Sequence, residues 1–159
     1  MSAVLAQHGR EHVVLERGHT GGRWQAGSWD SLRFQFPNWS SQLPGYRYAG
    51  DDPDGFAHHS QILRLIERYA RSIDAPVREH ADVVALAVAD VGSGFDVSTT
   101  LGSLRARRVV LATGPFQRPS IPPFAGEVAS SVTQLDPTRY RNPGELPAGA
   151  VLVVGSGAS

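Results

Sequence analysis

The chain contains no cysteine, and every one of its 15 basic residues is an arginine, so it has no lysine either. The lack of cysteine excludes thiol nucleophiles, dithiol redox pairs, disulfides and cysteine-ligated zinc. The lack of lysine excludes a phosphate-loop lysine, a Schiff-base lysine and a lysine general base. Because 15 acidic residues balance the arginines, no basic field favours nucleic acid, and we expect no nucleic-acid partner.

Long apolar runs are also missing. No stretch approaches the roughly 18 apolar residues of a membrane span, and the first residues lack the pattern of a signal peptide. We therefore expect a cytoplasmic protein without a membrane span. The chain has 159 residues, of which 41% are hydrophobic and 8% are aromatic. This length and composition are sufficient for one domain of ordinary size with a hydrophobic core.

The hydrophobic pattern at the start predicts a helix followed by a strand. Residues 1–9 are typical of the last turns of a helix that stops at Gly9, and residues 11–16 of a strand buried on both faces. Since helix and strand in this order form the second half of a βαβ unit, we expect the first strand of that unit to precede Met1. Residues 17–54, rich in glycine, proline and aromatic residues, indicate a long packed loop with one short strand.

The rest of the chain alternates between one clear helix and short strands. The apolar stripe predicts an amphipathic helix over residues 58–73, with Ser60 as its N-cap. Strands are predicted over residues 77–79, 83–89, 94–99 and 103–106, with a hairpin turn at 92–94. Two further apolar runs, residues 108–114 and 150–154, predict buried strands.

The last predicted strand runs into Gly155, Ser156 and Gly157. Dinucleotide-binding units begin with a buried strand and Gly-x-Gly, because the glycines let backbone N–H groups approach a pyrophosphate at a helix N-terminus. An ordinary turn is the alternative. A hydrolase elbow of the form Gly-x-Ser-x-Gly is less favoured, since its acid and histidine would have to follow Ser159.

Glu16 ends the strand that is predicted over residues 11–16. In the dinucleotide fold, an acidic side chain at this place accepts hydrogen bonds from ribose hydroxyls, about 20 residues beyond the glycine loop. Counting back by that distance places the loop before Met1. The alternative is an exposed glutamate that pairs with Arg10 or Arg17.

Two motifs of small residues complete the pattern. Gly21 and Gly22 precede Trp24, and paired glycines let the backbone lie flat against a large planar ring. Thr113 and Gly114 end the strand predicted over residues 108–114, at the sheet edge where open α/β folds bind ligands. For Trp24, the alternative is an ordinary core aromatic residue.

The order of these motifs resembles that of bacterial flavin-containing monooxygenases, which are FAD/NAD(P)-binding flavoproteins. The similarity runs almost end to end, and the motifs are specific together rather than singly. They are residues 15–17 (LER), 21–24 (GGRW), 29–33 (WDSLR), 37–39 (PNW), 43–45 (LPG), 50–56 (GDDPDGF), 112–115 (ATGP), 140–143 (YRNP) and 155–157 (GSG).

The resemblance implies an α/β fold, namely an incomplete FAD/NAD(P)-binding Rossmann-like domain with a small antiparallel β-meander. Residues 1–118 would form a partial FAD-binding domain that lacks its first strand and its glycine loop. Residues 119–159 would form a crossover and the truncated start of an NADPH-binding domain.

The resemblance also assigns roles in cofactor binding. Glu16 and Arg17 would hold the adenosine of FAD, Val83 would offer its backbone to the adenine, and Trp24 would line the flavin. Two further groups of residues complete the assignment: Thr113 and Gly114 at the FAD phosphates, and Gly155, Ser156 and Gly157 at the start of the NADPH site.

The implied activity is that of an NADPH-dependent flavin monooxygenase, which uses NADPH, FAD and O2 to oxygenate a small organic substrate. The chain would be the FAD-binding portion of such an enzyme, and no residue in it is a candidate general base or nucleophile. We expect the isolated chain to be inactive and to bind FAD weakly or not at all, since the pyrophosphate contacts of the glycine loop would be missing.

Two alternatives to this activity stay open. One is a non-catalytic truncated remnant or nucleotide-binding module. The other is an FAD-dependent NAD(P)H reductase, which would need a cysteine pair that several such enzymes place near Gly21 and Gly22.

The sequence departs from the family pattern at two positions. In the long monooxygenase fingerprint Phe-x-Gly-x-x-x-His, Phe124 and Gly126 fit, but Ser130 stands at the histidine position. Asp136 also stands where this branch of the family has a histidine. The sequence therefore does not support assignment to oxygenation of a ketone, as against oxygenation of a heteroatom.

The six histidines predict no metal site, because none shows a ligand spacing such as His-x-x-x-His with a further carboxylate. His58 and His59 are interpreted as a polar turn at a helix start. The acidic segment 51–54 lacks the glycine and terminal glutamate of a calcium loop, and it is interpreted as a solvated turn.

Overall fold

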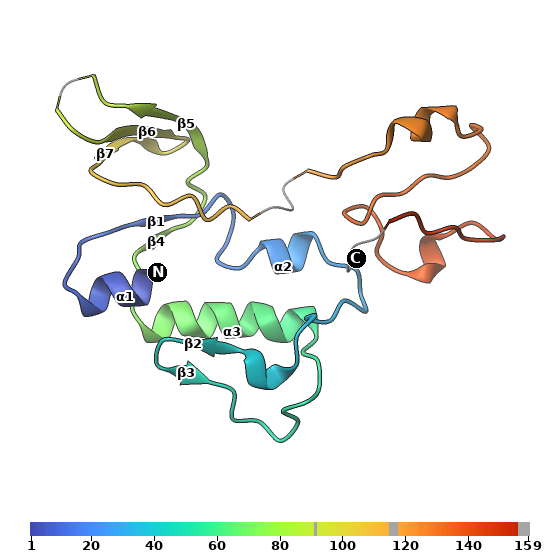
Figure 1. Cartoon of the computed structure of the whole chain (residues 1–159), viewed down its shortest axis with the longest axis horizontal. Helices are drawn as coiled ribbons and strands as arrows, with labels where there is room; N and C mark the ends of the chain where they lie inside the picture. Colours follow the sequence, from blue (N-terminus) through green and yellow to red (C-terminus); the bar gives the residue numbers. More distant parts are fainter. Residues whose placement is uncertain (91, 115–117, 156–159) are drawn as a thin grey trace.

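Two short parallel strands, β1 (Val14–Leu15) and β4 (Val77–Arg78), organise the first part of the chain (Figure 1). The computed structural model describes residues 1–90, 92–114 and 118–155. Helix α3 (His59–Ser72) lies in the connection between the two strands. Parallel neighbours joined through a helix form a βαβ unit, so the predicted α/β, Rossmann-like fold is confirmed.

Helix α1 (Ser2–Gln7) precedes β1 and ends close to where the sequence predicts. Gly9 adopts a φ of +60°, the left-handed conformation that commonly follows a helix. The next strand is shorter than predicted, because only Val14 and Leu15 of residues 11–16 have a partner in β4.

Helix α3 confirms the predicted helix over residues 58–73 to within one residue at each end. Its apolar stripe faces the interior, where Ile62 is 7% exposed. The N-cap is His58, however, and not the predicted Ser60. The backbone N–H of His58 donates to the Gln61 side chain at 2.7 Å, and the His58 ring accepts from the Ser60 N–H at 3.3 Å. A histidine can take this role because its Nδ1 can accept a hydrogen bond.

The long segment between β1 and α3 holds more regular structure than the single short strand predicted. It contains a helical turn, α2 (Arg23–Ala26), a 3-10 turn, η1 (Asn38–Ser40), and a hairpin of β2 (Gln42–Leu43) and β3 (Tyr46–Arg47). Helix α2 packs against α3. Asn38 is buried, and its side-chain amide donates to the carbonyl of Asp52 at 2.8 Å.

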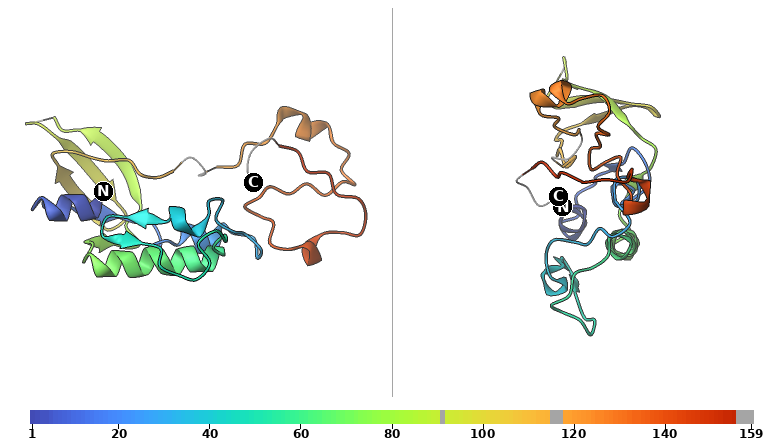
Figure 2. Two further views of the ribbon diagram at one scale, coloured as in Figure 1. Left: turned by 60° about the horizontal axis from the view of Figure 1, so that its bottom comes forward. Right: turned by 90° about the vertical axis from the view of Figure 1, so that its right-hand side faces the viewer.

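The predicted antiparallel meander is confirmed in β5 (Val83–Val88), β6 (Phe95–Thr99) and β7 (Gly102–Ala106). Strand β6 lies in the middle and carries Val97, which is buried. In Figure 2 the meander lies at one end of the molecule and residues 118–155 at the other. These last residues contain the 3-10 turns η2 (Pro123–Glu127) and η3 (Pro143–Glu145).

The two buried strands predicted over residues 108–114 and 150–154 are wrong. Both segments are irregular, and in the described part of the chain neither pairs with a strand. Leu111 is 75% exposed and Leu152 is 86% exposed. A run of β-branched residues becomes a strand only where a neighbouring strand takes up its N–H and C=O groups, and no strand among the described residues is paired with these two runs.

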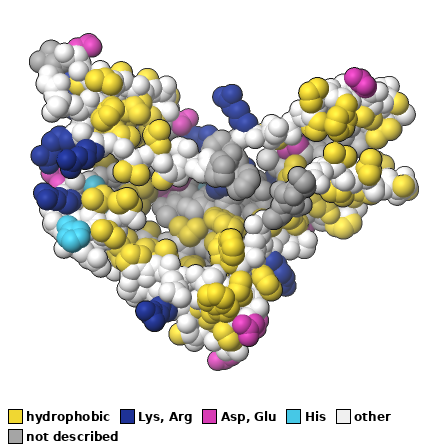
Figure 3. Space-filling model, in the orientation of Figure 1, with side chains coloured by type: hydrophobic (Ala, Val, Ile, Leu, Met, Phe, Trp, Pro, Cys, Tyr) yellow, Lys and Arg dark blue, Asp and Glu magenta, His cyan; other side chains and the backbone are white. Residues whose placement is uncertain are grey.

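Apolar side chains reach the surface over the meander and over residues 118–155 (Figure 3). The buried apolar residues among those described are small or isolated, namely Ala3, Ile62, Ala81, Ala89 and Val97. No helix in the described ranges has both the length and the apolar character needed to cross a membrane.

Candidate functional site

Glu16 follows β1 directly and lies half-buried at the carboxyl end of the parallel pair. Its N–H donates to the carbonyl of Arg78 at 3.0 Å, and its own carbonyl accepts from Ala81 N–H at 2.9 Å. Its Oε1 accepts from the backbone N–H of Gly18 at 2.9 Å. The carboxylate therefore stands at the sheet edge where open α/β folds bind ligands.

The alternative interpretation of Glu16 was a surface ion pair with Arg10 or Arg17. Within residues 1–90, 92–114 and 118–155, the ion pairs are His19–Glu79 and Arg105–Asp96. Glu16 therefore forms an ion pair with neither Arg10 nor Arg17 in these ranges. Arg17 is exposed beside it.

The loop after β1 is fixed to the end of β4 through Glu79. Its Oε1 accepts from both the backbone N–H and the hydroxyl of Thr20, each at 2.7 Å, and its Oε2 lies 3.0 Å from His19 Nδ1. The Thr20 N–H, the Thr20 hydroxyl and His19 together lower the pKa of Glu79 to about 2. An ionised carboxylate thus joins the two loops that follow the parallel strands.

Gly21 and Gly22 allow the loop after β1 to turn tightly onto α3. Gly21 has a φ of +76°, and a Cβ placed on it would lie 2.9 Å from Cδ1 of Leu63. A Cβ on Gly22 would lie 2.9 Å from the carbonyl oxygen of His19. The paired glycines therefore have a packing role that was not part of the sequence interpretation.

Trp24 lies half-buried on α2. Its ring meets Phe34 edge to face, with 5.9 Å between the ring centroids. Its carbonyl accepts from the Ser28 hydroxyl at 2.6 Å and lies 3.1 Å from Nδ1 of His59. Only the Phe34 contact involves the ring, so the core-aromatic alternative and the role of Trp24 beside a flavin both stay predictions.

Val83 begins β5 close to Glu16 in space. It pairs with Thr99, and the register shifts between Val83 and Ala85, as in a β-bulge. Ala81, two residues before it, is the residue whose N–H binds the Glu16 carbonyl. The start of β5 therefore lies at the same end of the parallel β1–β4 pair as Glu16 and Arg17.

The remaining predicted positions lie in exposed segments. Thr113 and Gly114 follow β7 in an irregular stretch, and Gly114 has a φ of +73°. Gly155 is exposed, whereas Ser156 and Gly157 lie outside the described residues. The cofactor-binding roles assigned to these positions stay predictions.

Two family motifs that are far apart in the sequence contact each other directly. The guanidinium of Arg141 donates to the carbonyl of Ala26 at 3.0 Å, and the carbonyl of Arg141 accepts from Asp30 N–H at 2.8 Å. The side-chain amide of Asn142 donates to the Asp30 carboxylate at 2.9 Å. Residues 140–143 are thereby held against the start of the 29–33 motif.

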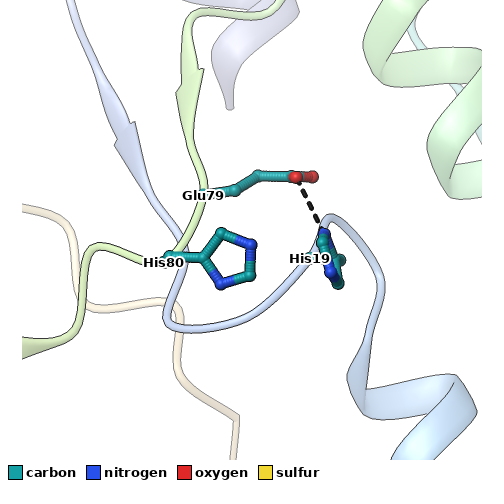
Figure 4. A group of neighbouring side chains, drawn as sticks. All are labelled: His19, Glu79 and His80. Atoms are coloured by element: carbon teal, nitrogen blue, oxygen red, sulfur yellow. Dashed lines mark hydrogen bonds and ion pairs between the residues drawn. The ribbon is translucent and has the colours of Figure 1, made fainter.

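A group of three side chains near Glu16 was missed by the sequence analysis (Figure 4). One potential ligand atom from each of His19, Glu79 and His80 lies within 4.8 Å of the other two. His19 and Glu79 are 60 residues apart, so no local spacing could indicate the group. The signal that was available is positional, since His19 follows one predicted strand and Glu79 ends another, and the carboxyl ends of parallel neighbours are adjacent.

Comparison with known proteins assigns a family to this arrangement. The model of the family described as pyridine nucleotide-disulphide oxidoreductase matches residues 1–159. An uncharacterized CzcO-like oxidoreductase of Geobacillus kaustophilus is 40% identical over 147 residues, which are 92% of this chain and 41% of that protein. A Baeyer-Villiger monooxygenase of Streptomyces coelicolor is 27% identical, over 94% of this chain and 29% of that protein.

The fold is also found among solved structures. The crystal structure described as OTEMO in complex with FAD and NADP superposes with a TM-score of 0.62 at 20% identity. The match covers 77% of this chain and 24% of the other. The chain spans less than half the length of the curated relatives it matches.

Proposed function

This chain belongs to the pyridine nucleotide-disulphide oxidoreductase family, and we propose that it is the FAD-binding portion of an NADPH-dependent flavin monooxygenase. The substrate of the proposed enzyme is a small organic molecule, which is oxygenated with O2. The absence of cysteine excludes dithiol chemistry within these residues, despite the disulphide in the family description. A dithiol reductase would need its cysteine pair outside these residues.

The observation that carries the proposal is the position of Glu16 at the carboxyl end of the β1–β4 pair. One of its two oxygens is used by Gly18 N–H, and the carboxylate has a second oxygen with which to accept from a ribose hydroxyl. The residues present thus fit the adenosine end of FAD. In the proposal, Arg17 lies along the same nucleoside, and the backbone of Val83 receives the adenine.

In the proposal, the other residues of the site contact the remaining parts of FAD and NADPH. Trp24 lines the flavin, Thr113 and Gly114 approach the FAD phosphates, and Gly155, Ser156 and Gly157 begin the NADPH site. When bound, FAD supplies the redox chemistry with NADPH and O2, and the protein supplies position and exclusion of water.

The division of the chain is part of the same proposal. Residues 1–118 contribute to the FAD-binding domain, and residues 119–159 form a crossover that leads into the NADPH-binding domain. Arg141 and Asn142 contact Ala26 and Asp30, so the two parts are connected through backbone and side-chain groups.

The test is titration of the uniformly 15N-labelled chain with FAD, followed by NMR, a method that detects weak binding as well as tight binding. We expect amide shifts at Arg17, Gly18 and Val83. In Glu16→Gln, the side chain can still accept a hydrogen bond but loses its charge. Because a charged hydrogen bond exceeds a neutral one by about 1 kcal/mol, FAD binding should weaken roughly fivefold.

The matched control is Glu11→Gln, which removes an exposed carboxylate five positions before Glu16 on the same segment. It should bind FAD as the unmodified chain does. Equal affinity in Glu16→Gln, or shifts confined to residues remote from the β1–β4 pair, would show that the adenosine is not held here.

A further inference from the structure

His19, Glu79 and His80 bring two imidazoles and one carboxylate together at the loops that follow β1 and β4 (Figure 4). His19 Nδ1 and Glu79 Oε2 are 3.0 Å apart. The two rings meet edge to face, with 4.5 Å between their centroids. Three potential ligand atoms therefore converge from two loops that only the fold makes neighbours.

The surrounding backbone holds these side chains in place. The N–H of His80 donates to the carbonyl of Gly18 at 3.0 Å, which joins the two loops directly. The N–H and hydroxyl of Thr20 both bind Oε1 of Glu79, so Oε2 is the oxygen that faces His19. Outer hydrogen bonds of this kind orient the carboxylate ligands of protein metal sites.

We propose that His19, Glu79 and His80 form a binding site for a divalent transition metal ion such as Zn²⁺. Two histidines and one carboxylate are a ligand set that suits zinc. Ligands about 2.0–2.1 Å from a tetrahedral zinc ion are about 3.3 Å from one another. The 3.0 Å pair is close to this separation, and the remaining separations, within 4.8 Å, would have to shorten by at most about 1.5 Å.

The site is open to solvent on one side. His19, Thr20 and Glu79 border a hollow of about 540 Å³ whose opposite wall is formed by the last turns of α3 and the residues after it, including Arg71 and Asp74. The hollow gives an ion a path to His19 and Glu79, and His80 is exposed beside them. Such a metal would tie the loop after β1 to the loop after β4, independently of any cofactor.

The test is titration of the full 159-residue chain, without an affinity tag, with Co²⁺ and then Zn²⁺. Co²⁺ bound by nitrogen and oxygen ligands absorbs visible light. We expect one Co²⁺ per chain, and loss of its absorption when one equivalent of Zn²⁺ displaces it. His19→Gln and Glu79→Gln should each lower the affinity at least about tenfold, because even outer-shell changes cost this much.

Two further variants complete the experiment. His80 has a φ of +58°, so His80→Asn is the suitable replacement, since asparagine tolerates this backbone conformation. It should also weaken binding. The matched control is His8→Gln, which removes an exposed histidine outside the group and should leave the affinity unchanged.

The outcomes distinguish a site from general histidine binding. Unchanged Co²⁺ affinity in both His19→Gln and Glu79→Gln would overturn the proposal, as would an equal loss in His8→Gln. Should His80→Asn disturb the fold, as judged from the amide spectrum, the other two variants decide the question. If Co²⁺ were bound nonspecifically by any two histidines, Glu79→Gln would bind it as well as the unmodified chain. Such a result would also contradict the proposed site.

Discussion

Residues 83–88 (VVALAV) and 151–154 (VLVV) are both runs of aliphatic residues rich in valine, yet only the first is a strand. Strand β5 is bound to β6 along its length, whereas residues 151–154 pair with no strand in the described part of the chain. Composition is thus not what separates the two regions. A β-strand forms where the tertiary structure supplies a partner, and the pattern of side chains alone does not create one.

The same contrast holds for the larger regions that contain these runs. Residues 1–106 carry the parallel pair, three helices and the meander, and their loops are joined by hydrogen bonds across long sequence separations. Residues 118–155 contain two 3-10 turns, and they reach the first region through Arg141 and Asn142. The first region should therefore account for most of the folding free energy.

The largest expected difference between the regions comes from truncating one aliphatic side chain in each. Ile62→Ala removes a side chain that is 7% exposed in α3 and should lower the free energy of unfolding by about 2–5 kcal/mol. Leu152→Ala removes one that is 86% exposed and should change it by less than about 0.5 kcal/mol. Urea denaturation of both variants measures the difference, and equal losses would contradict the contrast.

A smaller effect is expected from the turn that fixes the loop after β1 onto α3. Gly21→Ala forces a side chain into a φ of +76° and against Leu63, and should cost about 1–3 kcal/mol. Gly45→Ala is the control, because Gly45 has the same φ with open space around it. If thermal denaturation shows the same loss for both variants, the close approach of α3 contributes nothing beyond backbone strain.

The smallest effect is expected from the contact between the two regions. Arg141→Ala removes hydrogen bonds to the carbonyls of Ala26, Thr138 and Tyr140, and should cost about 1 kcal/mol or less because the site is partly exposed. Limited proteolysis should show faster cleavage within residues 118–155, while the first region stays resistant. Arg139→Ala, two positions earlier, should leave the cleavage rate unchanged, and acceleration in both variants would argue against a specific contact.

The sequence predicted those elements whose signal is local. Helix α3 was found from its apolar stripe, α1 from its glycine stop, and the meander from alternation and its turn glycines. The N-cap was misplaced by two residues, because His58 acts through a ring nitrogen that depends on its neighbours Ser60 and Gln61. The hairpin of β2 and β3 was missed because its strands have only two residues each.

The candidate site likewise contains one residue that the sequence predicted and other groups that it could not predict. Glu16 could be singled out because it ends an apolar run, and that position has a known use in dinucleotide folds. The group of His19, Glu79 and His80 could not be found by spacing, since it exists only because β1 and β4 are parallel neighbours. The contact of Arg141 with Ala26 likewise joins residues 115 positions apart.

The sequence by itself determined the amphipathic helix, the meander and the lack of thiol and lysine chemistry within these residues, because each depends on residue identity or on spacing within one segment. The class of fold was predicted from the order of motifs along the chain, through its resemblance to a known family. Only the tertiary structure decided which apolar runs became strands, which loops meet beside Glu16, and why Gly21 must lack a side chain. Those outcomes depend on backbone groups finding partners far along the chain, and a local pattern carries no information about which partner is within reach.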